Sequence, residues 1–171
     1  MKFILPGALI AALSACSASG DLQVIDQKST SVRSGSTVAL NVESTPEAGD
    51  PAEVEKGVAQ AKEHLHQRLS EEGPFKSVVG AQGSSDYKMD VVLKEVDEVG
   101  GVSQGLFGAF AGANSMSGKV TVTDNSNGLV LTSYNARGDS AAKSLFSTFS
   151  GEYTFDSAIQ VFGDKVIEGL Q

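Results

Sequence analysis

The thiol of Cys16 is a candidate for covalent modification, because of the residues that surround it in the sequence. Cys16 is the only cysteine among 171 residues, so an internal disulfide is excluded. It stands where an apolar run, Phe3 to Leu13, gives way to small and polar residues. A thiolate is a good nucleophile. A lone cysteine at this position therefore favours covalent modification over packing in a core.

The residues before Cys16 resemble the lipobox of bacterial lipoproteins. Lys2 gives a basic start, and the apolar run of about eleven residues that follows matches the core of a secretory signal peptide. It is too short to span a bilayer, because a spanning helix needs roughly twenty residues. Leu13, Ser14 and Ala15 supply the aliphatic and small residues of a lipobox. The resemblance implies cleavage before Cys16 and acylation of its thiol, with palmitate as a typical acyl chain.

This anchor predicts a location on the periplasmic side of the outer membrane. Ser17 follows Cys16, whereas an aspartate there would resemble an inner-membrane retention signal. Two or more acyl chains anchor a protein stably, since each buried methylene contributes about 0.8 kcal/mol. We expect residues 1–15 to be the signal peptide and residues 16–37 to be a flexible tether. An apolar island at residues 22–25 leaves open that part of the tether pairs as an edge strand.

Residues 38–171 predict a single α+β domain. A capped amphipathic helix follows Asp50 and stops before Gly73 and Pro74, and a second one begins near Phe155 and ends the chain. The order is strand, helix, four strands, helix, which predicts one mixed or antiparallel sheet of about five strands with both helices on one face. A phase shift of the alternation at Glu95 predicts a β-bulge. The strand patterns cover residues 38–42, 75–79, 87–96, 116–123 and 129–136.

Several stretches of this domain resemble small proteobacterial lipoproteins of uncharacterised function. They read GPFKSVV, SDYKMDVVLKEVD, GLFGAFAGA and VTVTDNSNGLVL, and the likeness covers residues 38–170. Similar architecture occurs in envelope lipoproteins related to YajG and in the periplasmic N-terminal domain of TolB. The resemblance implies a periplasmic accessory module that binds another envelope component, and it supplies no catalytic residues.

Enzymatic activity is not expected, although one motif leaves an alternative open. Ser103 lies in a G-x-S-x-G pattern, which is typical of hydrolase nucleophile elbows. Such an elbow needs a histidine later in the chain, whereas His64 and His66 both precede it. A serine hydrolase using Ser103 therefore remains the alternative to a binding module.

No metal, cofactor or nucleic acid site is expected. His64 and His66 are two positions apart on a helix, so their side chains point about 200° apart, whereas metal pairs on a helix are spaced by three or four. The net charge of −8 repels phosphate backbones. No glycine motif stands between a strand and a helix in the arrangement that binds dinucleotides.

Two Gly/Ser-rich segments, residues 101–114 and 140–154, carry large apolar side chains that are candidates for partner binding. Antiparallel alternation of the last strands places both segments at one end of the sheet. A first strand (38–42) running opposite to the strand from Tyr87 would bring the tether from Cys16 to that end too. The competing interpretation is that these side chains cap the core, and a third is that a small apolar ligand binds between sheet and helices. The candidates are Leu106, Phe107, Phe110, Phe146, Phe149 and Tyr153.

Overall fold

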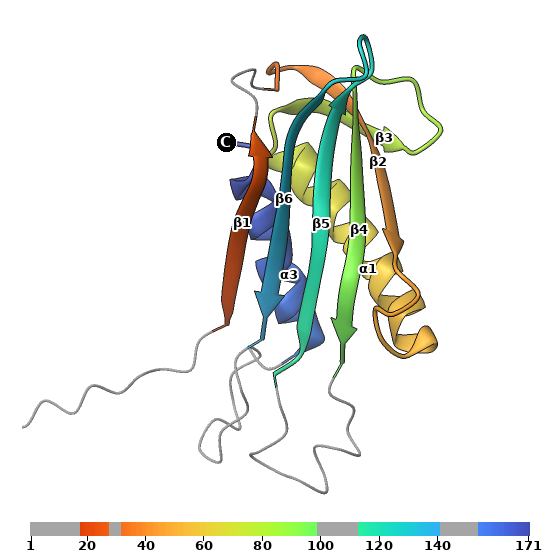
Figure 1. Ribbon diagram of the computed structural model, residues 1–171, viewed down its shortest axis with the longest axis vertical. Helices are drawn as coiled ribbons and strands as arrows, with labels where there is room; N and C mark the ends of the chain where they lie inside the picture. Colours follow the sequence, from red (N-terminus) through yellow and green to blue (C-terminus); the bar gives the residue numbers. More distant parts are fainter. Residues whose placement is uncertain (1–17, 28–31, 99–112, 141–153) are drawn as a thin grey trace, which may run out of the picture.

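The computed structural model describes residues 18–27, 32–98, 113–140 and 154–171, which form one mixed sheet of six strands with two helices on one face (Figure 1). No helix in these ranges has the length and apolar character needed to cross a bilayer. The helices are α1 (Pro51–Glu71) and α3 (Phe155–Glu168). The strands are β1 (Ser19–Gln27), β2 (Ser36–Ser44), β3 (Phe75–Gly80), β4 (Tyr87–Asp97), β5 (Ser115–Asp124) and β6 (Val130–Asp139).

The strand order across the sheet is β1-β6-β5-β4-β2-β3. Strands β4, β5, β6 and β1 pair antiparallel in turn, whereas β2 runs parallel to both β4 and β3. The unit β2–α1–β3 is thus a parallel crossover through a helix, as the sequence predicts. The α+β class and the placement of both helices on one face are confirmed, and the sheet has one strand more than expected.

The additional strand is β1, which lies within the segment expected to be a tether. It pairs with β6 along its length, with Ser19 opposite Asp139 and Leu22 opposite Ala136. The apolar island is therefore part of an edge strand, and Leu22 of this strand packs against the core. The segment predicted as a tether, residues 16–37, thus contains a strand at residues 19–27, which answers the question that the sequence left open for the island at residues 22–25. A polar edge strand bonded through its backbone to one neighbour leaves little trace in a hydrophobicity pattern.

The core lies between the sheet and the helices, and its side chains come from the predicted stripes. On α1 the buried stripe contains Ala61, Leu65 and Leu69. The α1 cap is confirmed, because the Asp50 carboxylate accepts a hydrogen bond from the Ala52 amide over 3.0 Å. The sheet and α3 contribute the other large, fully buried side chains, including Val38, Leu40, Tyr87, Met89, Val91, Leu93, Val96, Met116, Tyr134 and Phe162.

Helix α3 lies unusually close to β6, because a glycine removes a side chain between them. A Cβ added at Gly138 would lie 2.3 Å from both the Ala158 carbonyl oxygen and the Phe162 amide nitrogen. Further along the helix, the buried Tyr134 hydroxyl donates to the Val166 carbonyl over 2.7 Å. Burial raises the pKa of Tyr134, so the phenol stays protonated and remains a donor. These contacts fix α3 on the β6 side of the sheet.

A bulge in β4 decides which side chains face away from the helices. The register between β4 and β5 shifts between Leu93 and Glu95, which confirms the bulge predicted from the sequence. Leu93 and Val96 remain in the core. Lys94 and Glu95 both lie on the other face, where they contact polar side chains of β6. We call the face of the sheet that carries no helix the open face.

Candidate functional site

Four strands meet at one end of the sheet in a single row of paired residues. Ser19, at the start of β1, lies opposite Asp139, the last residue of β6. Asp139 also pairs with Ser115 at the start of β5, and Ser115 pairs with Asp97 at the end of β4. Helix α3 starts at this end as well (Figure 1). We call this row of Ser19, Asp97, Ser115 and Asp139 the entry end.

This arrangement confirms that β4, β5 and β6 bring the borders of both apolar segments to one end. The route by which the N-terminal chain arrives there differs from the prediction. The strand predicted at residues 38–42 was expected to run opposite to β4, but β2 runs parallel to it. The N-terminal chain instead enters the sheet at this end through β1, whose first residue, Ser19, lies in the row.

Hydrogen bonds join the borders of the two apolar segments directly. The Ser140 amide donates to the Asn114 carbonyl over 2.9 Å, and the Asn114 amide donates to Ser140 Oγ over 3.0 Å. The Asn114 side-chain amide donates to the same oxygen over 3.2 Å. Both residues are buried, with exposed fractions of 4% and 3%. The two segments therefore leave the sheet from one tightly bonded position.

Beside the entry end, the open face carries a closed ionic cluster. The Arg137 Nε lies 3.0 Å from both carboxylate oxygens of Asp139, and its Nη1 donates to Glu95 over 2.6 Å. Ser115 and Ser117 also donate to Glu95, over 2.8 and 3.4 Å. Burial alone would raise the pKa of Glu95, but these hydrogen bonds and the Arg137 charge outweigh it and lower that pKa. Every charge in the cluster has a partner, which favours a structural role.

The predicted functional side chains lie outside the described residues. This holds for the acylation candidate Cys16, for the alternative nucleophile Ser103 and for the apolar partner-binding candidates. The structure describes the strand ends from which the two apolar segments leave the sheet. Those candidates are Leu106, Phe107, Phe110, Phe146, Phe149 and Tyr153.

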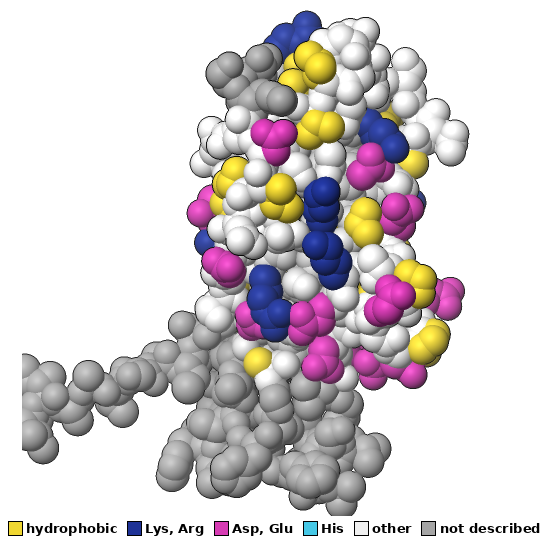
Figure 2. All heavy atoms as spheres, in the orientation of Figure 1, with side chains coloured by type: hydrophobic (Ala, Val, Ile, Leu, Met, Phe, Trp, Pro, Cys, Tyr) yellow, Lys and Arg dark blue, Asp and Glu magenta, His cyan; other side chains and the backbone are white. Residues whose placement is uncertain are grey.

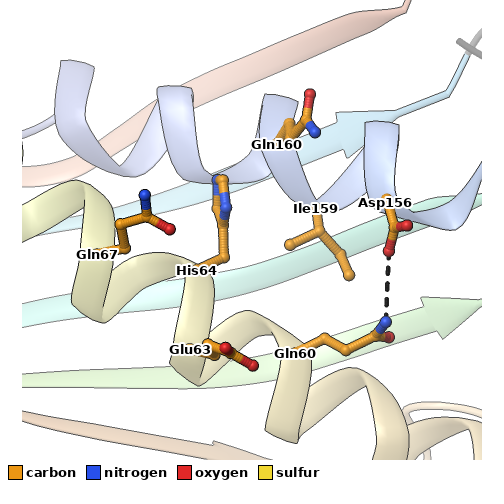
Figure 3. Close-up of a pocket in the computed structure, with 7 residues that line it drawn as sticks. All are labelled: Gln60, Glu63, His64, Gln67, Asp156, Ile159 and Gln160. Carbon is orange, nitrogen blue, oxygen red and sulfur yellow. Dashed lines mark hydrogen bonds between the residues drawn. The ribbon is translucent and has the colours of Figure 1, made fainter. Parts of the chain in front are cut away.

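The two histidines of α1 have different surroundings. The His64 ring points towards α3, where it lies beside Gly163 (Figure 3). Burial, and then the charge of Arg68, lower the pKa of His64, so its neutral form is favoured. The His66 Nε2 donates to the Val78 carbonyl over 3.2 Å. In the described part of the chain, no group of three or more His, Cys, Asp or Glu side chains is placed to hold a metal ion.

Pockets lined by described residues lie at the surface. One lies in the groove between α1 and α3 (Figure 3), a second at the β2–α1 connection, and a third on the open face. Core side chains fill the layer between sheet and helices. The described residues thus give no support to a carrier of an apolar ligand in that layer. The groove is lined by Gln60, Glu63, His64, Gln67, Asp156, Ile159 and Gln160.

Comparisons with known proteins match this fold and one family. The model of a domain of unknown function, DUF4410, matches residues 21–144. No curated protein matches the chain. The PelC dodecamer from Paraburkholderia phytofirmans is similar in structure with a TM-score of 0.57 and 15% identity, over 86% of this chain and 96% of that one.

A second solved structure, protein XCC0632 from Xanthomonas campestris of the DUF330 family, matches with a TM-score of 0.52 and 15% identity. The match covers 85% of this chain and 90% of that one. At such identity the likeness shows the fold alone. Membership of an uncharacterised family is thus supported, whereas the lipoprotein character and the likeness to YajG stay predictions.

Proposed function

The chain belongs to the DUF4410 family, a domain of unknown function, and we propose that it is a lipid-anchored, non-enzymatic binding module of the bacterial cell envelope. In this proposal the acylated Cys16 holds the domain at the periplasmic face of the outer membrane. The entry end carries the surface that meets an envelope partner at or near that membrane.

The observation that carries this proposal is the position of β1. Its first residue, Ser19, lies in the entry-end row and follows Cys16 by only three positions. A fully extended chain spans at most about 3.6 Å per residue, so three residues reach about 11 Å. An acylated Cys16 would therefore keep the entry end close to the membrane surface.

The short connection from Cys16 to Ser19 would also place the two apolar segments next to the membrane. Their borders, Asn114 and Ser140, are bonded together at the entry end. Side chains carried by both segments, among them Phe107, Phe110, Phe146 and Phe149, would meet the membrane interface or a protein held there. Large aromatic side chains are enriched at such interfaces. PelC, which shares the fold, is a dodecamer, so another copy of this chain is one partner to test.

Acylation is tested by membrane fractionation of cells that produce the wild-type chain or Cys16→Ser. We expect the wild-type protein in the outer membrane and the Cys16→Ser protein uncleaved or soluble. A matched variant, Ser17→Asp, keeps the cysteine and is expected to shift the protein to the inner membrane. Normal maturation and outer-membrane retention of Cys16→Ser would refute the anchor.

The binding surface is tested separately with Phe107→Ser combined with Phe110→Ser. If these side chains are exposed anchors, the melting temperature stays nearly unchanged and binding to liposomes or to a crosslinked envelope partner weakens. If they cap the core, the double variant loses the few kcal/mol expected for truncating buried aromatic residues. That loss would remove these residues from the proposed surface without affecting the test of Cys16.

A further inference from the structure

The open face of the sheet carries a row of basic side chains along its centre (Figure 2). The chain as a whole is acidic, with a net charge of −8. Lys88 and Arg137 are balanced by neighbouring carboxylates, Lys88 by Asp90 at 2.9 Å. Lys94 and Lys119 form no ion pair with any described residue. Two uncompensated ammonium groups on an acidic protein make this region attractive to an anion.

A pocket of about 270 Å³ lies beside these lysines, over β5 and β6. Its base is formed at Gly118 and Ala136, which are adjacent in the β5–β6 pair. Ala136 is buried in the core and Gly118 has no side chain, so neither covers the backbone on the open face. The bare backbone between longer side chains forms the hollow. The polar side chains around it are Asp21, Gln23, Lys94, Ser117, Asn135 and Arg137.

Hydrogen bonds connect the walls of this pocket across four strands. The β4 bulge places Lys94 so that its Nζ reaches over β5 and donates to Asn135 Oδ1 at 3.2 Å. The Asn135 amide then donates to Gln23 Oε1 on β1 at 3.4 Å. Arg137 on the other side is saturated by Glu95 and Asp139. These contacts hold the polar groups in place before any ligand binds.

The two rims of the pocket offer different chemistry. An ammonium group has three donors, and Lys94 uses one of them on Asn135, which leaves donors for an anion. At the β1 rim, the Asp21 carboxylate has no ion pair with any described residue. A carboxylate accepts hydrogen bonds from hydroxyl groups, and a side-chain amide both accepts from them and donates to them. An anionic group therefore fits the Lys94 rim, and hydroxyl groups fit the rim formed by Asp21, Gln23 and Ser117.

We propose that this open-face pocket binds a hydroxyl-rich anion, namely a sugar unit that bears a carboxylate or a phosphate. The volume suits one small ring, since pockets for drug-sized ligands occupy about 300–1,000 Å³. Six of the pocket's eight lining residues are polar, which favours a ligand with polar groups. The proposal depends only on described residues and is independent of whether Cys16 is acylated.

The test is titration calorimetry of the full chain, purified in detergent, with four probes: D-glucuronate, glucose 1-phosphate, inorganic phosphate and D-glucose. We expect saturable binding of at least one of the two anionic sugars, and their relative affinities identify the preferred anion. D-glucose lacks the anionic group and inorganic phosphate lacks the sugar hydroxyl groups, so each should bind more weakly than the anionic sugars. Equal binding of glucose and glucuronate, equal binding of phosphate and both sugars, or no binding by any probe would overturn the proposal.

Two variants assign the binding to this pocket. Lys94→Gln should weaken the anionic sugars about tenfold or more, the effect of losing one charge-assisted hydrogen bond. Asp21→Ala removes a hydroxyl acceptor together with a negative charge, so the affinity of the anionic sugars should fall relative to that of inorganic phosphate. Lys76→Gln, which removes an exposed lysine on β3, is the matched control and should bind as the wild type does. Wild-type affinity in a folded Lys94→Gln protein, checked by its melting temperature, would overturn the assignment.

Discussion

The backbone amide of Ser140 donates to the Asn114 carbonyl over 2.9 Å, and the Asn114 amide donates back to Ser140 Oγ over 3.0 Å. This reciprocal pair links the residue before β5 to the residue after β6. It fixes the spacing between the borders of the two apolar segments, because both residues are buried and cannot exchange these bonds for bonds to water.

Replacing Ser140 by alanine should therefore destabilise the domain. The substitution removes the acceptor of the buried Asn114 backbone amide, and it also removes one acceptor of the Asn114 side-chain amide. An unsatisfied buried donor costs about 1–3 kcal/mol. Urea unfolding should show a loss of that size for Ser140→Ala. Ser84→Ala, at an exposed serine, is the control and should change the free energy of unfolding by less than about 0.5 kcal/mol.

The close approach of α3 to β6 predicts that Gly138 accepts no larger residue. A Cβ at this position would collide with two backbone atoms of α3, at 2.3 Å each. Gly138→Ala should cost about 1–3 kcal/mol, because the helix must move away from the sheet. Gly80 also lies in a strand but has no atom within 4 Å of an added Cβ. Thermal unfolding should thus show a large loss for Gly138→Ala and none for Gly80→Ala.

The ionic cluster on the open face predicts a defined pH dependence. Its hydrogen bonds lower the pKa of Glu95 in the folded state, so ionised Glu95 stabilises the fold above its unfolded-state pKa of about 4.3. This contribution is lost as the pH falls through the lower, folded-state pKa. Glu95→Gln should cost about 0.5–1 kcal/mol at pH 7, since the pair is partly exposed.

The same substitution should have a smaller effect in acid. Below the folded-state pKa, Glu95 is protonated in both states, so wild type and Glu95→Gln should differ little in stability. Unfolding by urea at pH 7 and at pH 3 measures both differences. An unchanged difference between the two pH values would show that the charge of Glu95 contributes nothing to stability.

The position of β1 predicts that a chain starting at residue 32, which keeps all of β2, is less stable than one starting at residue 18. The shorter chain loses the packing of Leu22 on the core and leaves β6 as an open edge. Burial of even part of a leucine side chain contributes on the order of 1 kcal/mol. Thermal unfolding of the two chains should show a lower melting temperature for the shorter one. Equal melting temperatures would mean that β1 adds nothing to the stability of the sheet.

Most of the helices and strands could be predicted from local patterns. Periodic apolar residues and the Asp50 cap defined α1, and alternation defined β4 and its bulge at Glu95. These features depend on residues a few positions apart, so a single stretch of sequence contains their cause. Local patterns left open whether the island at residues 22–25 is an edge strand, because β1 pairs with residues of β6 more than a hundred positions away and does so mainly through backbone groups.

The sequence by itself determined the α+β class and the two helices with their buried faces, and it predicts a lipoprotein signal that ends at Cys16. Only the tertiary structure decided the direction of β2, the membership of β1 in the sheet and the meeting of four strand ends at Ser19, Asp97, Ser115 and Asp139. It also brought Asp21, Lys94 and Asn135 around one pocket. The physical reason is that signal motifs and amphipathic helices are encoded by neighbours along the chain. Strand order and pockets arise from long-range pairing, which depends on the packing of the whole sheet against α1 and α3.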